Sequence, residues 1–135
     1  MPAKRKTPPA VGGRFVLVYM TAGSIAEARR IGTALVRERL AACANILPRM
    51  ESVYWWQGRI ARGREAVLFL KTSATRVPAL LRRAKQLHSY EVPCIVILPI
   101  RAGWPPFLKW ITAETGHRSW GPGQLAGPAL RNRRR

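Results

Sequence analysis

The side chains best suited to coordination chemistry are few. The chain has two cysteines, Cys43 and Cys94, and two histidines, His88 and His117. A neutral imidazole nitrogen is a common metal ligand, and thiol or thioether sulfur favours Cu(I). His88 and Cys94, together with Met20 or Cys43, therefore form a candidate copper site. The alternatives are that His88 caps the end of a helix and that the cysteines are small core residues.

A second candidate group combines aromatic and basic side chains. Its members are Tyr54, Trp55, Trp56, Arg59, Lys71 and Tyr90. In an assembly of several copies, such residues can line a cationic, aromatic-walled pocket between subunits that binds a phosphate-bearing small anion. The sequence has no Walker motif and no G-x-G-x-x-G motif to support this interpretation. The alternative, which we favour, is that the aromatics pack against another subunit.

Catalytic groups are scarce in the sequence. The chain contains no aspartate, which excludes a Ser-His-Asp triad and two-metal sites held by aspartates. Its acidic residues are six scattered glutamates, and no potential nucleophile has an evident neighbouring base. Cys43 and Cys94 form no Cys-x-x-Cys pair, so neither a zinc knuckle nor a dithiol redox motif is indicated. We therefore expect a protein that is not an enzyme and has no obligatory cofactor.

The net charge of +18 is extreme for a chain of 135 residues. Residues 1–14 and 117–135 together carry nine basic residues and no acidic one, so these tails supply half of the excess. Their composition predicts a disordered basic arm and a disordered basic tail on either side of one domain at 15–116. Because such a surface attracts polyanions, non-specific binding through the tails is an alternative function, without specific recognition of nucleic acid.

The sequence also bears on location. No apolar run reaches the about 18–20 residues of a membrane span. The basic N-terminus lacks the apolar stretch of a secretory signal. We therefore expect a cytoplasmic protein without a membrane partner.

Hydrophobic patterning within the domain predicts four strands and three helices. The expected strands are residues 15–20, 43–56, 65–72 and 94–98, and residues 57–59 form either a turn or a bulge in a long hairpin. The expected helices are residues 25–39, a segment from near 75 to 88–90, and a short segment opened by Pro105 and Pro106. Ser24 and Glu27 form a capping box for the first helix. Pro48 lacks an amide donor, so the second strand should lie at a sheet edge or contain a bulge.

This β-α-β-β-α-β-α order predicts a ferredoxin-like α+β fold, in which helices cover one face of an antiparallel sheet. The first and third strands, which are apolar throughout, should be central. The long hairpin of the second and third strands carries Val53, Tyr54, Trp55 and Trp56. An exposed apolar edge is an aggregation hazard that pairing with further copies removes. We therefore expect a closed, symmetric homo-oligomer.

Several segments resemble the divalent-cation-tolerance (CutA) family in order and spacing. They are LAACANILP at 40–48, SVYWWQGRI at 52–60, LFLKT at 68–72, HSYEVPCIVILPI at 88–100 and FLKWI at 107–111. The resemblance implies a homotrimer of ferredoxin-like subunits with strands joined across subunits. It also implies a role in the response to metal ions, with weak copper binding. A signalling role by analogy with PII-like small-anion-binding trimers is the alternative.

The chain departs from the family pattern at several positions. Where family members with a proposed metal site have a cysteine near the end of the first strand, this chain has Met20. A pair of adjacent histidines is reduced to His88, and the glutamate after the motif proline is replaced by Cys94. Arg62 and Arg64 stand where acidic residues are common. These changes weaken a site for hard cations and raise the local positive charge.

Overall fold

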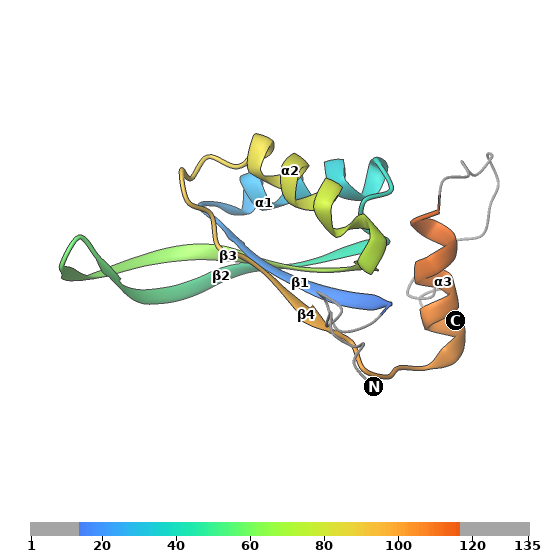
Figure 1. The fold of residues 1–135 in the computed structure, drawn as a ribbon. Coiled ribbons are helices and arrows are strands. Elements are labelled where there is room, and N and C mark those ends of the chain that lie inside the picture. The colour runs from blue at the N-terminus through green and yellow to red at the C-terminus, as the bar shows by residue number, and fades with distance from the viewer. Residues whose placement is uncertain (1–13, 117–135) are drawn as a thin grey trace, which may run out of the picture.

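The computed structural model describes residues 14–116, and the predicted arm and tail lie outside this range apart from Arg14. The elements are β1 (Phe15–Ala22), α1 (Ile25–Arg37), β2 (Cys43–Trp56), β3 (Arg59–Ser73), the 3-10 turn η1 (Ala74–Arg76), α2 (Val77–Leu87), β4 (Ile95–Pro99) and α3 (Pro105–Glu114). The strands form one antiparallel sheet in the order β2-β3-β1-β4. Helices α1 and α2 cover one face of the sheet (Figure 1). This arrangement confirms the predicted α+β, ferredoxin-like fold.

The core lies between the sheet and the helix layer. Alternate residues of the central strands, among them Val18 of β1 and Leu68 of β3, point toward α1 and α2 and are fully buried. The intervening residues of a strand point to the opposite face, which we call the outer face. Helix α1 buries Ile31 and Leu35 at helical spacing against the same core. The two central strands are β1 and β3, as predicted.

Local signals set the ends of the first helix. The Ser24 hydroxyl accepts a hydrogen bond from the Glu27 N–H at 3.1 Å, which is the predicted N-cap. The helix ends at Arg37, two residues before the predicted end, because Arg39 adopts a left-handed backbone with φ of 64°. The N–H groups of Leu40 and Ala41 then donate to the Leu35 carbonyl, which satisfies the last turn.

Strands β2 and β3 form a hairpin that projects well beyond the helix layer (Figure 1). Pro48 lies in the irregular stretch between Leu47 and Met50, on the edge strand, as predicted. The turn consists of Gln57 and Gly58, with φ of 50° and 80°, so strand pairing resumes at once between Trp56 and Arg59. The prediction that the third strand begins at 65 was wrong: β3 begins at Arg59, because this tight turn keeps the polar segment before 65 in register with β2.

Helix α3 lies beside the end of the sheet away from the hairpin (Figure 1). Its Ile111 side chain is fully buried, while Phe107 and Trp110 are half-buried. Arg39 donates to the Glu114 carboxylate at 2.6 Å. Arg76 Nε donates to the backbone carbonyl of the next residue, Thr115, at 2.7 Å. These contacts hold the C-terminal end of α3 against α1 and η1.

Candidate functional site

His88 is enclosed where the segment after α2 passes the end of β1. Its side chain is fully buried, with Nε2 2.7 Å from the Thr21 carbonyl oxygen and Nδ1 3.1 Å from the Tyr90 backbone nitrogen. A carbonyl oxygen only accepts, so Nε2 carries a proton and donates it, while Nδ1 accepts from the Tyr90 N–H. Both ring nitrogens are therefore engaged within the chain, and neither offers a free lone pair to a metal ion.

Glu27 lies next to His88 and ties the start of α1 to the segment after α2. Its carboxylate accepts from the Ser89 N–H at 2.7 Å, the Ser89 hydroxyl at 3.0 Å and the Gly23 N–H at 3.1 Å. Burial alone would raise the pKa of Glu27, but the hydrogen bonds from Ser89 and Gly23, with His88 nearby, lower it overall. The carboxylate is therefore charged at neutral pH and acts as a structural acceptor.

A second carboxylate, Glu65, connects the hairpin to the same segment. The Tyr90 hydroxyl donates to it at 2.9 Å and the Ser52 hydroxyl at 2.6 Å. Burial, followed by the hydrogen bond to Glu65, raises the pKa of Tyr90 to about 12. Tyr90 is therefore a neutral donor that fixes the segment before β4 against β3.

Cys94 is an exposed thiol just before β4, opposite Thr21 of β1. Partial burial of its sulfur and the nearby Glu65 charge raise the pKa of the thiol. A hydrogen bond with Thr21 lowers this pKa by less, so the net shift is upward. The thiolate is the form that binds soft metals, so this environment makes Cys94 an accessible ligand of low affinity.

The structure does not bring the four predicted soft ligands together. Met20 is fully buried in the core on the helix side of the sheet, while Cys94 lies on the outer face. Cys43 lies at the other end of that face, with its sulfur 3.9 Å from Lys71 Nζ. His88 is engaged as described above. Among residues 14–116, no three His, Cys, Asp or Glu side chains form a group that would hold a metal ion.

The predicted aromatic and basic group is also divided. Tyr54 and Trp56 share the outer face of the hairpin with Arg59, while Trp55 points to the opposite face. Lys71 is at the far end of β3, where Nζ donates to Asn45 Oδ1 at 2.6 Å. Tyr90 lies near Tyr54 at the base of the hairpin. A pocket that contains the whole group therefore needs side chains from more than one copy.

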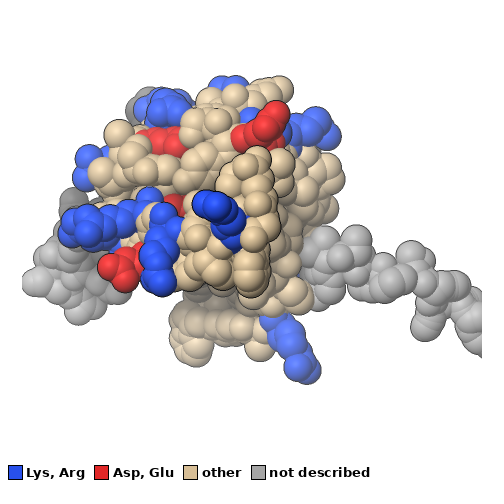
Figure 2. Space-filling model, turned by 90° about the vertical axis from the view of Figure 1, so that its left-hand side faces the viewer, with Lys and Arg blue, Asp and Glu red and all other residues tan. Residues whose placement is uncertain are grey.

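The outer face of the sheet is apolar and is exposed mainly on its two edge strands, while Thr21 and Val67 on the central strands are buried. Its cross-strand rows, from the pairing register, are Leu98, Leu17, Lys71 and Cys43; Val96, Tyr19, Phe69 and Asn45; and Thr21, Val67 and Leu47. Leu47, Val96 and Leu98 are 43–53% exposed, and Trp55 on the hairpin is 71% exposed. Basic side chains gather over the helix layer and along the hairpin, while the surface below is mostly neither basic nor acidic (Figure 2).

The sequence interpretation missed the role of the carboxylates. Glu27 was identified only as part of a capping box, yet two of its hydrogen bonds reach Ser89, 62 residues away. Glu65 was identified only as the first residue of a strand. The available signal was that both are acids in a basic chain that directly precede a residue of the apolar pattern, Ala28 or Ala66, and a carboxylate that close to a core is usually paired.

Comparison with known proteins identifies the family. Residues 16–114 match the sequence profile described as "CutA1 divalent ion tolerance protein", which covers nearly all of the described residues. This chain belongs to the CutA1 divalent ion tolerance family. The family is named for tolerance to divalent ions rather than for a reaction.

Individual CutA relatives are similar in sequence and in structure. The divalent-cation tolerance protein CutA of Thermus thermophilus is 46% identical over 100 residues, covering 74% of this chain and 97% of that protein. Its solved structure superposes with a TM-score of 0.74 over 76% of this chain and 99% of that chain, at 45% identity. Protein CutA of mouse is 37% identical over 113 residues, covering 80% of this chain and 64% of that protein.

A solved CutA from Archaeoglobus fulgidus is described as a periplasmic divalent cation tolerance protein. It superposes with a TM-score of 0.74 at 36% identity, covering 76% of this chain and 99% of that chain. Within residues 14–116, none of the helices combines the length and apolar character needed to cross a bilayer. The predicted cytoplasmic location of the present chain is not tested by either observation and stays a prediction.

Proposed function

We propose that this chain acts in tolerance to divalent cations as a homotrimer in the cytoplasm, and that it binds copper weakly. The observation that carries the proposal is the set of exposed apolar residues on the edge strands of the outer face, together with the exposed hairpin, in a chain of the CutA1 family. A single subunit leaves this surface in water, and burial of apolar area stabilises an assembly by roughly 25 cal/mol per Å² before association costs.

The geometry of the sheet supports closed assembly. Both edge strands, β2 and β4, have one side without a partner strand among residues 14–116. The hairpin projects beyond its own helix layer (Figure 1), so its residues are available for contact with a neighbouring subunit. Its Trp55 and Trp56 are 71% and 57% exposed in one chain, and contact with a neighbour would remove them from water. A closed ring uses all such edges, which suppresses open-ended aggregation.

Copper would be cargo rather than a resident cofactor, and the accessible ligand for it is Cys94. Of the four predicted ligands, Cys94 is the one that is both exposed and close to a carboxylate, Glu65. One protonated thiol with one carboxylate supports only weak binding, because the metal must displace the thiol proton. The small-anion alternative has less support, since Lys71 already donates to Asn45 and packs 5.9 Å from the Phe107 ring centre.

The test is titration calorimetry of the metal-free full chain with Cu(I) and Cu(II), alongside light-scattering mass. Cys94→Ser should abolish the measured heat of Cu(I) binding, and Cys43→Ser, which changes the other cysteine, should leave it unchanged. A mass near three subunits before copper is added would agree with the proposal. A subunit that assembles only with copper would contradict it by making the metal structural, and equal binding by Cys94→Ser would remove Cys94 from the site.

A further inference from the structure

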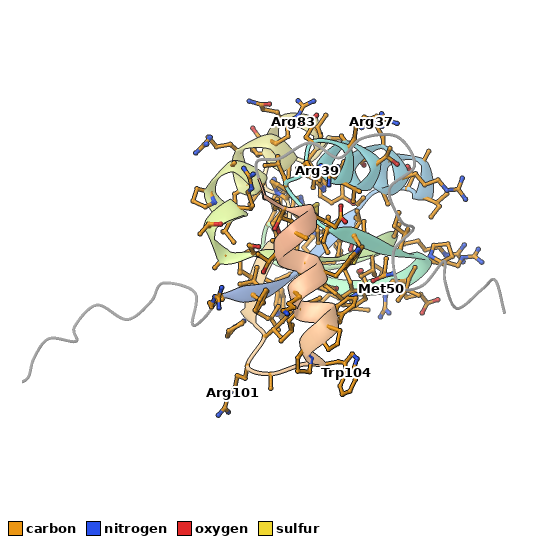
Figure 3. The ribbon with its side chains drawn as sticks, turned by 90° about the vertical axis from the view of Figure 1, so that its right-hand side faces the viewer. Arg37, Arg39, Met50, Arg83, Arg101 and Trp104 are labelled. Carbon is orange, nitrogen blue, oxygen red and sulfur yellow. The ribbon has the colours of Figure 1, made fainter. Side chains whose placement is uncertain are left out.

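The outward surface of the two helices that cover the sheet is strongly basic. Its basic residues are Arg29, Arg30 and Arg37 on α1 and Arg82, Arg83 and Lys85 on α2. All are exposed except Arg83, which is half-buried. Arg37 and Arg83 lie at the top of this surface, above the sheet (Figure 3). We call this set of six residues the helix-layer patch.

The two acidic residues next to the helix-layer patch on and directly after α1, Glu27 and Glu38, already have partners. Glu27 is buried and bonded to Ser89 and Gly23. Glu38 is held by Arg83, with Nε 3.0 Å from Oε1 and Nη2 3.1 Å from Oε2. No further acidic residue occurs on either helix.

Four side chains of the patch have no partner within the part of the chain that the structure describes. Arg30 donates to the Leu87 carbonyl at 3.3 Å, so it is engaged at one nitrogen. Within residues 14–116, the four side chains of the patch that make no hydrogen bond or ion pair are those of Arg29, Arg37, Arg82 and Lys85. Like charges at this density repel one another, and an external polyanion relieves the repulsion.

The four free cations are held on a rigid, extended platform. The helices are antiparallel, because Arg30 of α1 reaches the end of α2 while Glu38, at the end of α1, reaches Arg83. The 13 residues of α1 span about 20 Å at 1.5 Å per residue. That length corresponds to about six base pairs of a double helix at 3.4 Å each. The unpaired cations lie eight residues apart on α1 and three residues apart on α2, so the patch can contact several phosphates of one duplex.

The composition of the surface decides which polyanion it fits. Neither α1 nor α2 contains an aromatic residue, so bases of a single strand have nothing to stack on. The large apolar side chains that are exposed lie on β2, β3, β4 and the loops around them, and none of them lies on α1 or α2. An amphipathic membrane helix needs such residues at the bilayer, which argues against a lipid surface.

We propose that the helix-layer patch binds the phosphate backbone of double-stranded nucleic acid, without sequence preference. The patch is on the opposite side of the sheet from the apolar outer face, so nucleic acid and further subunits can be engaged at once. This differs from binding through the basic tails, because the contacts belong to the folded domain. In a homotrimer the patch would be present three times, which raises the apparent affinity for a long duplex.

The test is fluorescence anisotropy of the full chain with a labelled mixed-sequence duplex of about 20 base pairs, between about 50 and about 200 mM salt. The helix variant is R29Q/R37Q/R82Q/K85Q. The control variant, R49Q/R59Q/R62Q/R64Q, removes the same charge from exposed positions of the hairpin. All eight side chains are exposed, so both variants should fold, and circular dichroism checks this.

The helix variant should bind at least about tenfold more weakly, and the slope of log K against log salt should become shallower by about 3 to 4. The control should retain most of the affinity, and a single strand of the same length should bind more weakly than the duplex. Unchanged binding by the helix variant would assign the affinity to the tails and overturn the proposal. Equal losses in both variants, or tighter binding to phosphatidylserine vesicles than to duplex, would also overturn it.

Discussion

Both faces of the central sheet are apolar, but this chain covers the helix side far more completely than the outer face. On the helix side, Val18, Leu68 and Leu70 are fully buried beneath α1 and α2. On the outer face, Val96 and Leu98 of β4 are 47% and 43% exposed. Similar residue types therefore contribute to the fold of one subunit on one face, and remain available for contacts between subunits on the other.

The largest expected difference between the two faces is the effect of removing a side chain from the core. Leu68→Ala removes a fully buried side chain and should lower the free energy of unfolding by about 2–5 kcal/mol, measured by urea denaturation. The matched change on the outer face is Leu98→Ala. Its cost should depend on protein concentration, because it weakens association rather than the subunit itself. A concentration-independent loss as large as that of Leu68→Ala would contradict the distinction.

The next largest effect concerns the carboxylate that ties the start of α1 to the segment after α2. Glu27→Gln keeps the shape of the side chain but removes the charge that accepts from Ser89 and Gly23, and should cost about 1–3 kcal/mol. Because folding lowers the pKa of Glu27 below its ordinary value of 4.5, its contribution is present above that pH and is lost as the pH falls through the lowered value.

Thermal melts of wild type and Glu27→Gln, run from neutral to acid pH, test whether the stabilisation by Glu27 is lost as the pH falls. The two proteins should differ most near neutral pH and converge on acidification. The matched control is Glu51→Gln, an exposed carboxylate on the hairpin, which should change stability little. A difference that grows at low pH would show that the sign of the coupling is reversed.

A smaller effect is expected at the hairpin turn. Gly58 has φ of 80° and no atom within 4 Å of the position a Cβ would take, so Gly58→Ala introduces backbone strain without a clash. The cost should be about 1 kcal/mol in urea denaturation. Gly63→Ala, on the same hairpin but without a positive φ, is the control and should cost less. Equal costs would mean that the turn does not fix the hairpin.

The smallest effect is spectroscopic. The phenol of Tyr90 should ionise with a pKa of about 12 rather than at its ordinary value of 10.0, followed by ultraviolet difference absorbance. Removing the adjacent charge with Glu65→Gln should lower the pKa of Tyr90, since the hydrogen bond and charge of Glu65 both raise it. An unchanged titration in that variant would leave burial as the whole cause.

Local rules in the sequence predicted most of the fold. Ser24 caps α1 and Pro48 lies at an irregular edge strand, and each follows from the chemistry of one residue. The start of β3 was missed because Arg62, Gly63 and Arg64 are not typical of a strand. Their pairing depends on the turn ahead of them, and thus on geometry rather than on their own propensity.

The candidate site was less accessible from the sequence. Soft ligands were identified by residue type, but whether Met20 and Cys94 share a face depends on the register of β1 against β4. The hydrogen bonds of His88 to Thr21 and of Ser89 to Glu27 join residues 67 and 62 positions apart. No spacing rule within one segment encodes such contacts.

The central claim, that the outer face is where subunits meet, is tested most directly by the mass of the assembly. Light scattering on metal-free full-length chain should give a mass near three times the subunit mass of 15.1 kDa. The variant V96K/L98K, which places charges on the outer face, should lower that mass while circular dichroism stays unchanged. A wild-type mass of one subunit, or a V96K/L98K variant that keeps the mass of the wild type, would contradict the account.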